Sequence, residues 1–309
     1  MSTILLCPGQ GSQRVGMGKD LAERFPVARD TFAAVDEALG VKLSRIMWEG
    51  PEEELTLTHN AQPAILAHSA AVHAVVKERL GLPVLGLGHS LGEYSAYVAA
   101  GALDVTSAAL LVRRRGELLL EAGRNRPGAM AAILALDPAL VVEACAEASR
   151  DGEVAVAANL NEPEQTVISG DPAAVERAGE GCKTRGAKRV IMLKVSGAFH
   201  SPLMAPAVVG LRKALADTAF RDPRFPIIAN ATAHPVTVAS DATRLLAEQL
   251  TAAVRWTESI RAAASTAPEA AWIEIGPGAV LGGLLKKIIA GATATTLGTA
   301  DEVTRFLET

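Results

Sequence analysis

The sequence predicts an α/β protein in which a large, mainly parallel sheet is interrupted by a smaller inserted module. Short apolar segments alternate with longer helical patterns through most of the 309 residues, which is the order expected of a parallel sheet covered by helices. The middle of the chain departs from this alternation in a regular way. With 49% hydrophobic residues, the chain can also bury a large core.

The strands expected in the large sheet are short apolar segments. They are Ile4–Pro8, Val84–Leu87, Pro226–Ala229, Ala271–Ile275 and Ala294–Leu297. The expected helices are Ala61–Arg79, Leu91–Ala100, Val105–Ala122, Leu203–Asp217, Ala242–Leu250, Thr257–Ala264 and Val280–Ile289. Ser201 and Pro202 mark the start of one of them, because serine caps a helix well and proline fits its first position.

The middle of the chain is predicted as strand, helix, strand, strand, helix, strand, the order of a ferredoxin-like (βαββαβ) module. The segments are Ala129–Leu136, Pro138–Ser149, Val154–Ala158, Gln165–Ser169, Pro172–Arg185 and Arg189–Val195. Both helices begin with Asp-Pro, so we expect Asp137 and Asp171 to cap them. Polar or glycine-rich residues flank the module. We therefore expect an inserted subdomain over residues 126–196, with residues 1–125 and 197–309 forming the large α/β domain.

Composition and charge exclude several kinds of partner. The net charge of −4, without long runs of one sign, predicts no binding to nucleic acid or to an anionic membrane. The N-terminus has no secretion signal and no apolar run is long enough to cross a bilayer, so we expect a cytoplasmic protein, a monomer by default.

Cys7, Cys145 and Cys182 lack C-x-x-C spacing, which predicts neither a disulfide framework nor a zinc site. The six histidines have no metal-binding spacing, so no metal is expected.

The most informative motif is Gly88-His89-Ser90-Leu91-Gly92, a G-x-S-x-G sequence between an apolar segment and a helical pattern. That context predicts a nucleophile elbow, a sharp turn from strand to helix that exposes a serine, and hence a hydrolase-like core. The turn needs small residues on both sides of the serine, and the N–H groups at the helix start can hold an oxyanion. Ser90 is therefore the candidate acyl-carrying nucleophile. Without its context, the motif would also fit an ordinary glycine-rich loop.

A serine nucleophile needs an adjacent base, which is usually a histidine. We expect His200 to be that base, because it precedes a helix where the chain re-enters the large domain, whereas His89 leaves the turn in a different direction; a structural loop histidine is the alternative. No carboxylate between Ser90 and His200 stands out as a third triad member, so a backbone carbonyl or an amide would orient the imidazole. The glycine-rich loop Cys7–Gln13 is expected to supply a second oxyanion-binding N–H.

Several short segments together carry a resemblance to a known family. They are Pro8–Gln13, Gln62–Ala64, Gly88–Glu93, Arg115–Gly116, Gly197–Ser201 and Glu274–Gly278. In order and spacing, from about Thr3 to Ile289, the chain resembles the malonyl-CoA:acyl carrier protein transacylases, acyltransferases of fatty-acid synthesis. The resemblance implies a hydrolase-like α/β core with a ferredoxin-like insertion, and a reaction that needs no metal or redox cofactor.

The resemblance also implies a role for each matching residue. Ser90 corresponds to the serine that takes the malonyl group from coenzyme A, and His200 to the base that activates it. The backbone amides of Gln10 and Leu91 would form the oxyanion hole. Arg115 corresponds to the arginine that grips the malonyl carboxylate, a task that suits a planar guanidinium.

Three further correspondences concern the same pocket. Gln249 matches the residue whose main-chain carbonyl orients the histidine, which would explain the missing acid. Gln62 matches a glutamine that lines the pocket. Phe199, immediately before His200, resembles the malonyl-selecting form of the family, in which its ring crowds a branched acyl group.

The sequence therefore predicts an acyltransferase that moves a malonyl group from malonyl-CoA to the phosphopantetheine thiol of acyl carrier protein through a malonyl-serine ester. A discrete transferase of a polyketide pathway or of a malonate decarboxylase would have a similar sequence. A serine esterase or thioesterase is a further alternative. Arg115 and the missing triad acid make this alternative less favoured. A non-catalytic subunit that only binds carrier protein would not need Ser90, His200 and Arg115 together.

Overall fold

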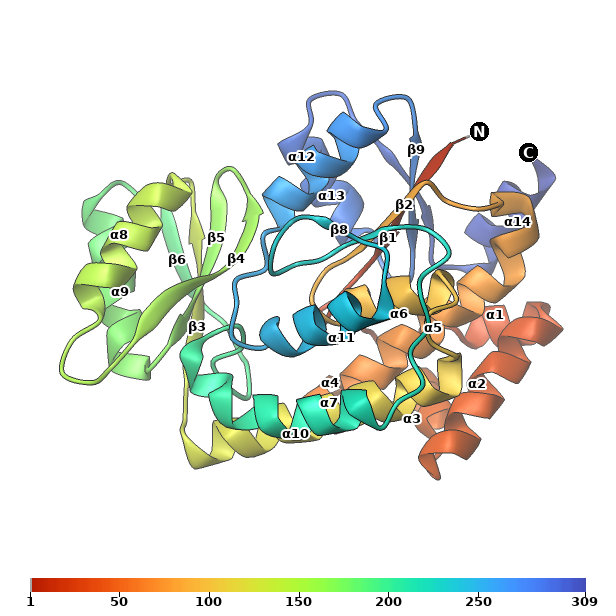
Figure 1. The fold of residues 1–309 in the computed structure, drawn as a ribbon, viewed down its shortest axis with the longest axis horizontal. Coiled ribbons are helices and arrows are strands. Elements are labelled where there is room, and N and C mark those ends of the chain that lie inside the picture. Colours follow the sequence, from red (N-terminus) through yellow and green to blue (C-terminus); the bar gives the residue numbers. More distant parts are fainter. Residues whose placement is uncertain (1) are drawn as a thin grey trace.

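The computed structural model describes residues 2–309 and contains two β-sheets (Figure 1). The strands of the large sheet are Thr3–Cys7 (β1), Leu85–Gly88 (β2), Ile227–Ile228 (β7), Pro235–Val236 (β8), Ala271–Ile275 (β9) and Ala294–Leu297 (β10). Their order is β10-β9-β1-β2-β7-β8, and all pairings are parallel except that of β7 with β8. The prediction of a mainly parallel sheet is confirmed. β7 is shorter than predicted, and β8 was not predicted.

Helices cover both faces of the large sheet. The predicted helices correspond to Thr58–Leu80 (α5), Leu91–Ala99 (α6), Val105–Asn125 (α7), Ala205–Ala216 (α10), Ala239–Glu248 (α11), Trp256–Thr266 (α12) and Val280–Ile288 (α13). A short 3₁₀ turn, Pro202–Met204, precedes α10, and the Ser201 side chain accepts from the Leu203 N–H as predicted for the start of this element. Among residues 2–309, no helix is long and apolar enough to cross a membrane.

The central strand β1 shows why the sheet has to be covered on both sides. Successive side chains of a strand point to opposite faces. Leu5 and Cys7 join the core beneath α5, α6 and α7, whereas Ile4 and Leu6 pack with residues of α12 and α13. A strand with apolar side chains on both faces is typical of a parallel sheet with helices on each side.

The structure also contains short helices that the sequence analysis did not predict. They are Lys19–Arg24 (α1), Pro26–Leu39 (α2), Leu43–Glu49 (α3), Glu52–Thr56 (α4) and Ala300–Glu308 (α14). Most of them are too short for an apolar period to be recognised. Their end signals are nevertheless present: Pro26 stands at the first position of α2 and Gly40 follows its last residue with φ 65°, while Thr299 and Glu302 form a capping box on α14.

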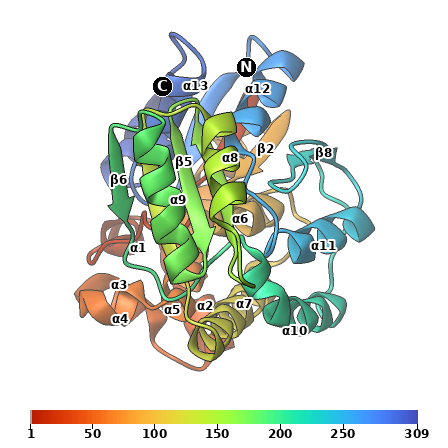
Figure 2. The ribbon, with the colours of Figure 1, turned by 90° about the vertical axis from the view of Figure 1, so that its left-hand side faces the viewer.

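A second, small sheet contains four strands, all paired antiparallel in the order β4-β5-β3-β6. The bounds are Ala129–Leu134 (β3), Ala155–Glu162 (β4), Gln165–Gly170 (β5) and Arg189–Met192 (β6), with helices Pro138–Ala148 (α8) and Pro172–Thr184 (α9). The two helices lie side by side on the outer face of this sheet (Figure 2). This is the predicted ferredoxin-like arrangement, and the predicted fold class is confirmed.

The predicted caps of α8 and α9 differ in outcome. Asp137 accepts a hydrogen bond from the Ala139 N–H at 2.8 Å and caps α8. For Asp171 the prediction is wrong, because its side chain makes no capping bond to α9. Its carboxylate accepts two bonds from the Arg126 guanidinium, at 3.0 and 2.8 Å, and one from the Val154 N–H at 2.8 Å. Charge-assisted, paired bonds are stronger than a single cap, so the tertiary contact prevails.

We expect His68 to make the fold sensitive to acid. Its side chain in α5 is fully buried, and burial lowers its pKa from 6.5 to about 4, since the charged imidazolium would lose its hydration. Below pH 6.5 the unfolded chain binds a proton that the folded chain does not, so the free energy of unfolding decreases as the pH falls toward 4. His68 should lower the free energy of unfolding by about 2 kcal/mol between pH 7 and pH 5.

Urea unfolding at the two pH values measures this effect. The variant His68→Phe keeps an aromatic ring at the position and should lose less stability between pH 7 and pH 5 than the wild type. The pKa of His73 is also lowered to about 4 by burial, but this residue contributes equally in both proteins. An equal loss of stability in wild type and variant would contradict the prediction.

Candidate active site

Ser90 lies at the sharp turn between β2 and α6, where the parallel strands end. Its backbone has φ 52° and ψ −105°, a conformation that residues with a side chain rarely adopt. Both flanking glycines are sterically required. A Cβ at Gly88 would lie 1.9 Å from the carbonyl carbon of Gly92, and a Cβ at Gly92 would lie 2.0 Å from the carbonyl oxygen of Cys7. The small residues of the G-x-S-x-G motif therefore allow the close approach that the turn needs.

Asn230, which follows β7, holds this turn from the side. Its Oδ1 accepts from the Ser90 N–H at 2.6 Å, and its Nδ2 donates to the Gly88 carbonyl at 2.7 Å. One side chain thus binds the peptide groups on both sides of His89. The Ser90 N–H is consequently occupied and cannot serve as an oxyanion donor.

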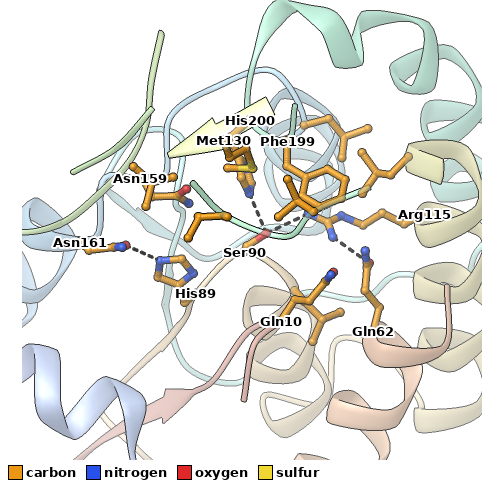
Figure 3. Close-up of a pocket in the computed structure, with 16 residues that line it drawn as sticks. Gln10, Gln62, His89, Ser90, Arg115, Met130, Asn159, Asn161, Phe199 and His200 are labelled. Atoms are coloured by element: carbon orange, nitrogen blue, oxygen red, sulfur yellow. Dashed lines mark hydrogen bonds between the residues drawn. The ribbon is translucent and has the colours of Figure 1, made fainter. Parts of the chain in front are cut away.

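His200 lies within hydrogen-bond reach of the serine (Figure 3). Its Nε2 is 2.8 Å from Ser90 Oγ, and its Nδ1 is 2.8 Å from the carbonyl oxygen of Gln249. A carbonyl can only accept, so Nδ1 carries the proton and Nε2 is free to accept from Ser90. The side chain is buried, and this burial, together with the charge of Arg115, lowers the pKa of His200 to about 3. At neutral pH the imidazole is therefore in its basic form.

Arg115 projects from α7 into the same place and is only 2% exposed. Its Nη1 donates to Gln62 Oε1 at 2.7 Å, and its Nη2 donates to Ser90 Oγ at 3.1 Å and to Gln249 Oε1 at 2.9 Å. The Tyr94 ring lies 5.5 Å from the guanidinium carbon, in cation–π range. Within residues 2–309, no carboxylate forms an ion pair with it. A buried positive charge held only by neutral groups can bind an anionic group beside Ser90.

Gln249, directly after α11, connects these groups. Its backbone carbonyl accepts from His200, as described above. Its side-chain Nε2 donates to the Ser90 carbonyl at 3.1 Å and to Glu93 Oε2 at 2.7 Å, while its Oε1 accepts from Arg115. The backbone and the side chain of one residue thus contact different parts of the site.

Two backbone N–H groups near Ser90 are candidates for binding an oxyanion. Leu91 is the first residue of α6, so its N–H has no acceptor within the helix. Gln10 lies in the loop after β1 and lines the same pocket as Ser90. Its Oε1 accepts from Thr58 Oγ1 at 2.8 Å, and Thr58 in turn accepts from Gln62 Nε2 at 3.0 Å, which ties the loop to α5.

Ser90, His200 and Arg115 border one cavity of about 210 Å³, together with Gln10, Gln62 and Leu91, and part of its wall comes from the small sheet. Met130 and Val167 belong to β3 and β5, while Leu193, Val195 and Phe199 lie on the segment that returns from β6. These five side chains are apolar, whereas Asn159 and Asn161 of β4 add polar groups to the same cavity. The structure therefore brings together all eight residues singled out from the sequence: Gln10, Gln62, Ser90, Leu91, Arg115, Phe199, His200 and Gln249.

His89 contacts a different partner from Ser90. Its Nε2 lies 2.8 Å from Asn161 Oδ1, and the two residues form a separate pair at the edge of the pocket (Figure 3). The sequence analysis missed Asn159, Asn161 and Asn230, and it gave no role to Glu93, although the segment Gly88–Glu93 contains it. Nothing local marks them, because their contacts join segments far apart in the chain; Asn230 is 140 residues from Ser90.

Comparison with known proteins adds the following matches. Residues 4–308 match the family described as the acyl transferase domain. A malonyl CoA-acyl carrier protein transacylase of Bacillus subtilis is 48% identical over 289 residues, which cover 93% of this chain and 91% of the relative. The protein of the same name from Escherichia coli K12 is 42% identical over 302 residues, 97% of each chain.

Solved structures match over the same length. An acyl carrier protein S-malonyltransferase from Vibrio cholerae has a TM-score of 0.93 at 41% identity, with 99% of each chain covered. A malonyl-transacylase in complex with a type II polyketide-synthase acyl carrier protein has a TM-score of 0.94 at 41% identity, covering 100% of this chain and 99% of its own. The similarity thus extends over both sheets and is not confined to the motifs.

We expect the variant Asn230→Ala to slow acylation of Ser90. It leaves the Ser90 N–H and the Gly88 carbonyl without partners, at a cost of about 1–3 kcal/mol for each buried group, and frees Ser90 to leave its strained conformation. The rate of acylation by an activated ester, followed by mass spectrometry, should fall about tenfold or more.

Asn60→Ala is the matched control for this prediction. Asn60 is also a buried asparagine, but its side chain bonds to Glu54 and Arg113, outside the pocket. Its loss should affect stability and leave the acylation rate of the folded protein unchanged. Equal rates in wild type and Asn230→Ala would show that this contact does not support Ser90.

Proposed function

Because the chain belongs to the acyl transferase family, with malonyl CoA-acyl carrier protein transacylases among its relatives, we propose that Ser90 carries a malonyl group from malonyl-CoA to acyl carrier protein. The protein is an acyltransferase, and fatty-acid synthesis is the setting that we propose for it. One observation carries the assignment of roles within the site. The buried guanidinium of Arg115 is bonded to Ser90 Oγ, so a charge that can hold an acyl carboxylate lies beside the atom that accepts the acyl group.

In the first half-reaction, His200 Nε2 takes the proton of Ser90 as Oγ attacks the thioester carbon of malonyl-CoA. The carbonyl oxygen becomes an oxyanion, which the N–H groups of Leu91 and Gln10 hold. The C–S bond then breaks, and the leaving coenzyme A thiolate takes the proton from His200. The product is a malonyl ester on Ser90 and free coenzyme A.

In the second half-reaction, the phosphopantetheine thiol of acyl carrier protein gives its proton to His200 and attacks the ester carbon. The same backbone N–H groups hold the second oxyanion. The C–O bond to Ser90 then breaks, and Oγ recovers the proton from His200. The carrier leaves with the malonyl thioester, and the site returns to its starting state.

Arg115 binds the far carboxylate of the malonyl group in this scheme. In the free site its Nη2 donates to Ser90 Oγ, and this N–H becomes available to the substrate once Oγ carries the acyl group. Gln62 and Gln249 hold the guanidinium in place through their side-chain oxygens. Phe199, in the apolar wall, restricts the space next to the acyl chain and so favours malonyl over branched groups.

A polyketide pathway is a second candidate setting, because a malonyl-transacylase of the same fold was solved with a type II polyketide-synthase carrier protein. The chemistry would be the same, and only the accepting carrier would differ. Hydrolysis of the ester is less well supported, since His200 is oriented by a carbonyl and not by a carboxylate.

We propose that the reaction needs no prosthetic group, because its proton and acyl transfers balance with Ser90, His200 and the two thiols alone. Within the described chain, no cluster of three or more His, Cys, Asp or Glu side chains is arranged to hold a metal ion.

A cytoplasmic location is proposed from the sequence, in which the cysteines form no disulfide framework. Residues 126–196 are proposed as the inserted subdomain, since they include the whole small sheet.

Intact-protein mass spectrometry after brief mixing with malonyl-CoA tests the proposal. The wild type should gain one malonyl group, and Ser90→Ala should gain none. Arg115→Ala should be acylated about 100- to 1,000-fold more slowly, because the malonyl carboxylate would be buried without its partner. Holo acyl carrier protein, added next, should remove the adduct and become malonylated.

Arg114→Ala serves as the matched control, because Arg114 is exposed and pairs with Glu117 on the surface. It should be acylated like the wild type. A wild type that forms no adduct would contradict the covalent mechanism, and an adduct lost to water at the same rate without carrier would identify a hydrolase. Chasing with fatty-acid and polyketide carriers in parallel separates the two settings.

We also predict an unusual pH dependence for the first half-reaction. His200 must be neutral to act as base, and its pKa of about 3 lies far below the ordinary value of 6.5. The value of kcat/KM for acetyl-CoA, a donor without the second carboxylate that Arg115 binds, should therefore stay constant between about pH 5 and pH 7, measured with brief exposure so that the fold persists. A decline with a midpoint near pH 6.5 would show that His200 titrates like an exposed histidine.

A further inference from the structure

Glu93 is a buried carboxylate beside the active site that has no part in the proposed reaction. It lies in the first turn of α6 and is 1% exposed. Its Oε2 accepts from the Asn230 backbone N–H at 3.0 Å and from Gln249 Nε2 at 2.7 Å. No Lys or Arg side chain of residues 2–309 forms an ion pair with it. A buried carboxylate without a cationic partner is costly, so a local advantage must offset that cost.

The contact with Gln249 fixes which end of its side-chain amide faces Arg115. A carboxylate only accepts hydrogen bonds, and a guanidinium only donates them. Gln249 lies between the two, with Nε2 toward Glu93 at 2.7 Å and Oε1 toward Arg115 at 2.9 Å. If the amide were reversed, its oxygen would face the Glu93 carboxylate, so that two acceptors met, and its NH₂ group would face the Arg115 guanidinium, so that two donors met. Glu93 therefore favours one orientation of the amide, the same one that the Ser90 carbonyl favours by accepting from Nε2 at 3.1 Å.

The effect on Arg115 can be separated from the other contacts of Glu93. Gln249 orients His200 through its backbone carbonyl, which does not depend on the orientation of the side-chain amide. The bond from Asn230 to Glu93 supports the turn at Ser90, and the turn serves every acyl donor equally. The Gln249 side chain, in contrast, connects the Glu93 carboxylate to the guanidinium by hydrogen bonds.

We propose that Glu93 is a positioning residue for acyl-group selection, which acts through the Gln249 amide to hold Arg115 in the orientation that receives a malonyl carboxylate. The proposal rests on the proposed function, in which Arg115 binds that carboxylate. Glu93 also places a negative charge one amide away from the buried guanidinium. It compensates this charge before the substrate arrives without occupying the guanidinium N–H groups.

The test compares acylation of Ser90 by malonyl-CoA and by acetyl-CoA, which lacks the second carboxylate. The acetyl rate reports the turn and the folded fraction, so the ratio of the two rate constants reports the role of Arg115. Glu93→Gln removes the negative charge, while its amide oxygen can still accept from the Asn230 N–H. We expect the malonyl-to-acetyl ratio to fall about tenfold. Assays at about pH 8 keep Glu93 ionised in the wild type, because burial raises its pKa to about 7.

Three further variants make the test specific. Glu93→Met has an apolar chain of similar length and serves if Glu93→Gln folds poorly; its ratio should fall as well. Glu274→Gln is the matched control, because Glu274 is equally buried but accepts from the Leu281 and Gly282 N–H groups, outside the site. Gln249→Ala should lower the ratio too, and adding Glu93→Gln to it should lower the ratio by a smaller factor than Glu93→Gln does in the wild type, since the two residues share the path through the amide.

The outcomes separate this proposal from the proposed function. A lower ratio in the Glu93 variants, an unchanged ratio in Glu274→Gln and a less than multiplicative loss in the double variant would support it. Equal losses of both rates in the Glu93 variants would overturn it and leave Glu93 with a structural role only. A wild type that malonyl-CoA does not acylate would overturn the proposed function itself.

Discussion

The active site depends on the sharp turn that holds Ser90 in strained backbone geometry between β2 and α6. Such a residue keeps its conformation only where its surroundings allow no other. Gly88 and Gly92 let the chain approach too closely for any Cβ, and Asn230 binds the peptide groups on both sides of the turn. Because Asn230 occupies the Ser90 N–H, the next N–H, that of Leu91, is the one left for an oxyanion. The contacts that stabilise the turn thus also decide which backbone group is free for the proposed reaction.

The charge of the site explains why a carbonyl orients His200. A buried carboxylate next to the imidazole would raise the pKa of His200 and would also pair with the guanidinium of Arg115. An acyl carboxylate would then have to compete for the same N–H groups. The Gln249 carbonyl fixes the tautomer of His200 without adding charge. Glu93 brings its charge no closer than the far side of the Gln249 amide, so the guanidinium remains available.

The sequence allowed prediction of features that rest on local patterns. The strands, most longer helices and the turn at Ser90 each have a signal within a few residues, and the order of these elements determines the fold class. Asp171 shows where this reasoning fails, because its carboxylate bonds to the guanidinium of Arg126 from another segment and does not cap its own helix. Glu93 and Asn230 show the same limit in the site. An acidic residue in the first turn of a helix and an asparagine in a loop are each expected on local grounds, and only the fold joins them to Ser90.

Strand periodicity in the small sheet accounts for the apolar half of the pocket. Ile133 and Ile168 point toward α8 and α9, whereas Met130 and Val167, on the opposite face of the same strands, line the cavity. One sheet therefore supplies both the core beneath its helices and a wall of the site. An apolar wall offers a water molecule few hydrogen-bond partners near an ester on Ser90, and exclusion of water protects a reactive intermediate from hydrolysis.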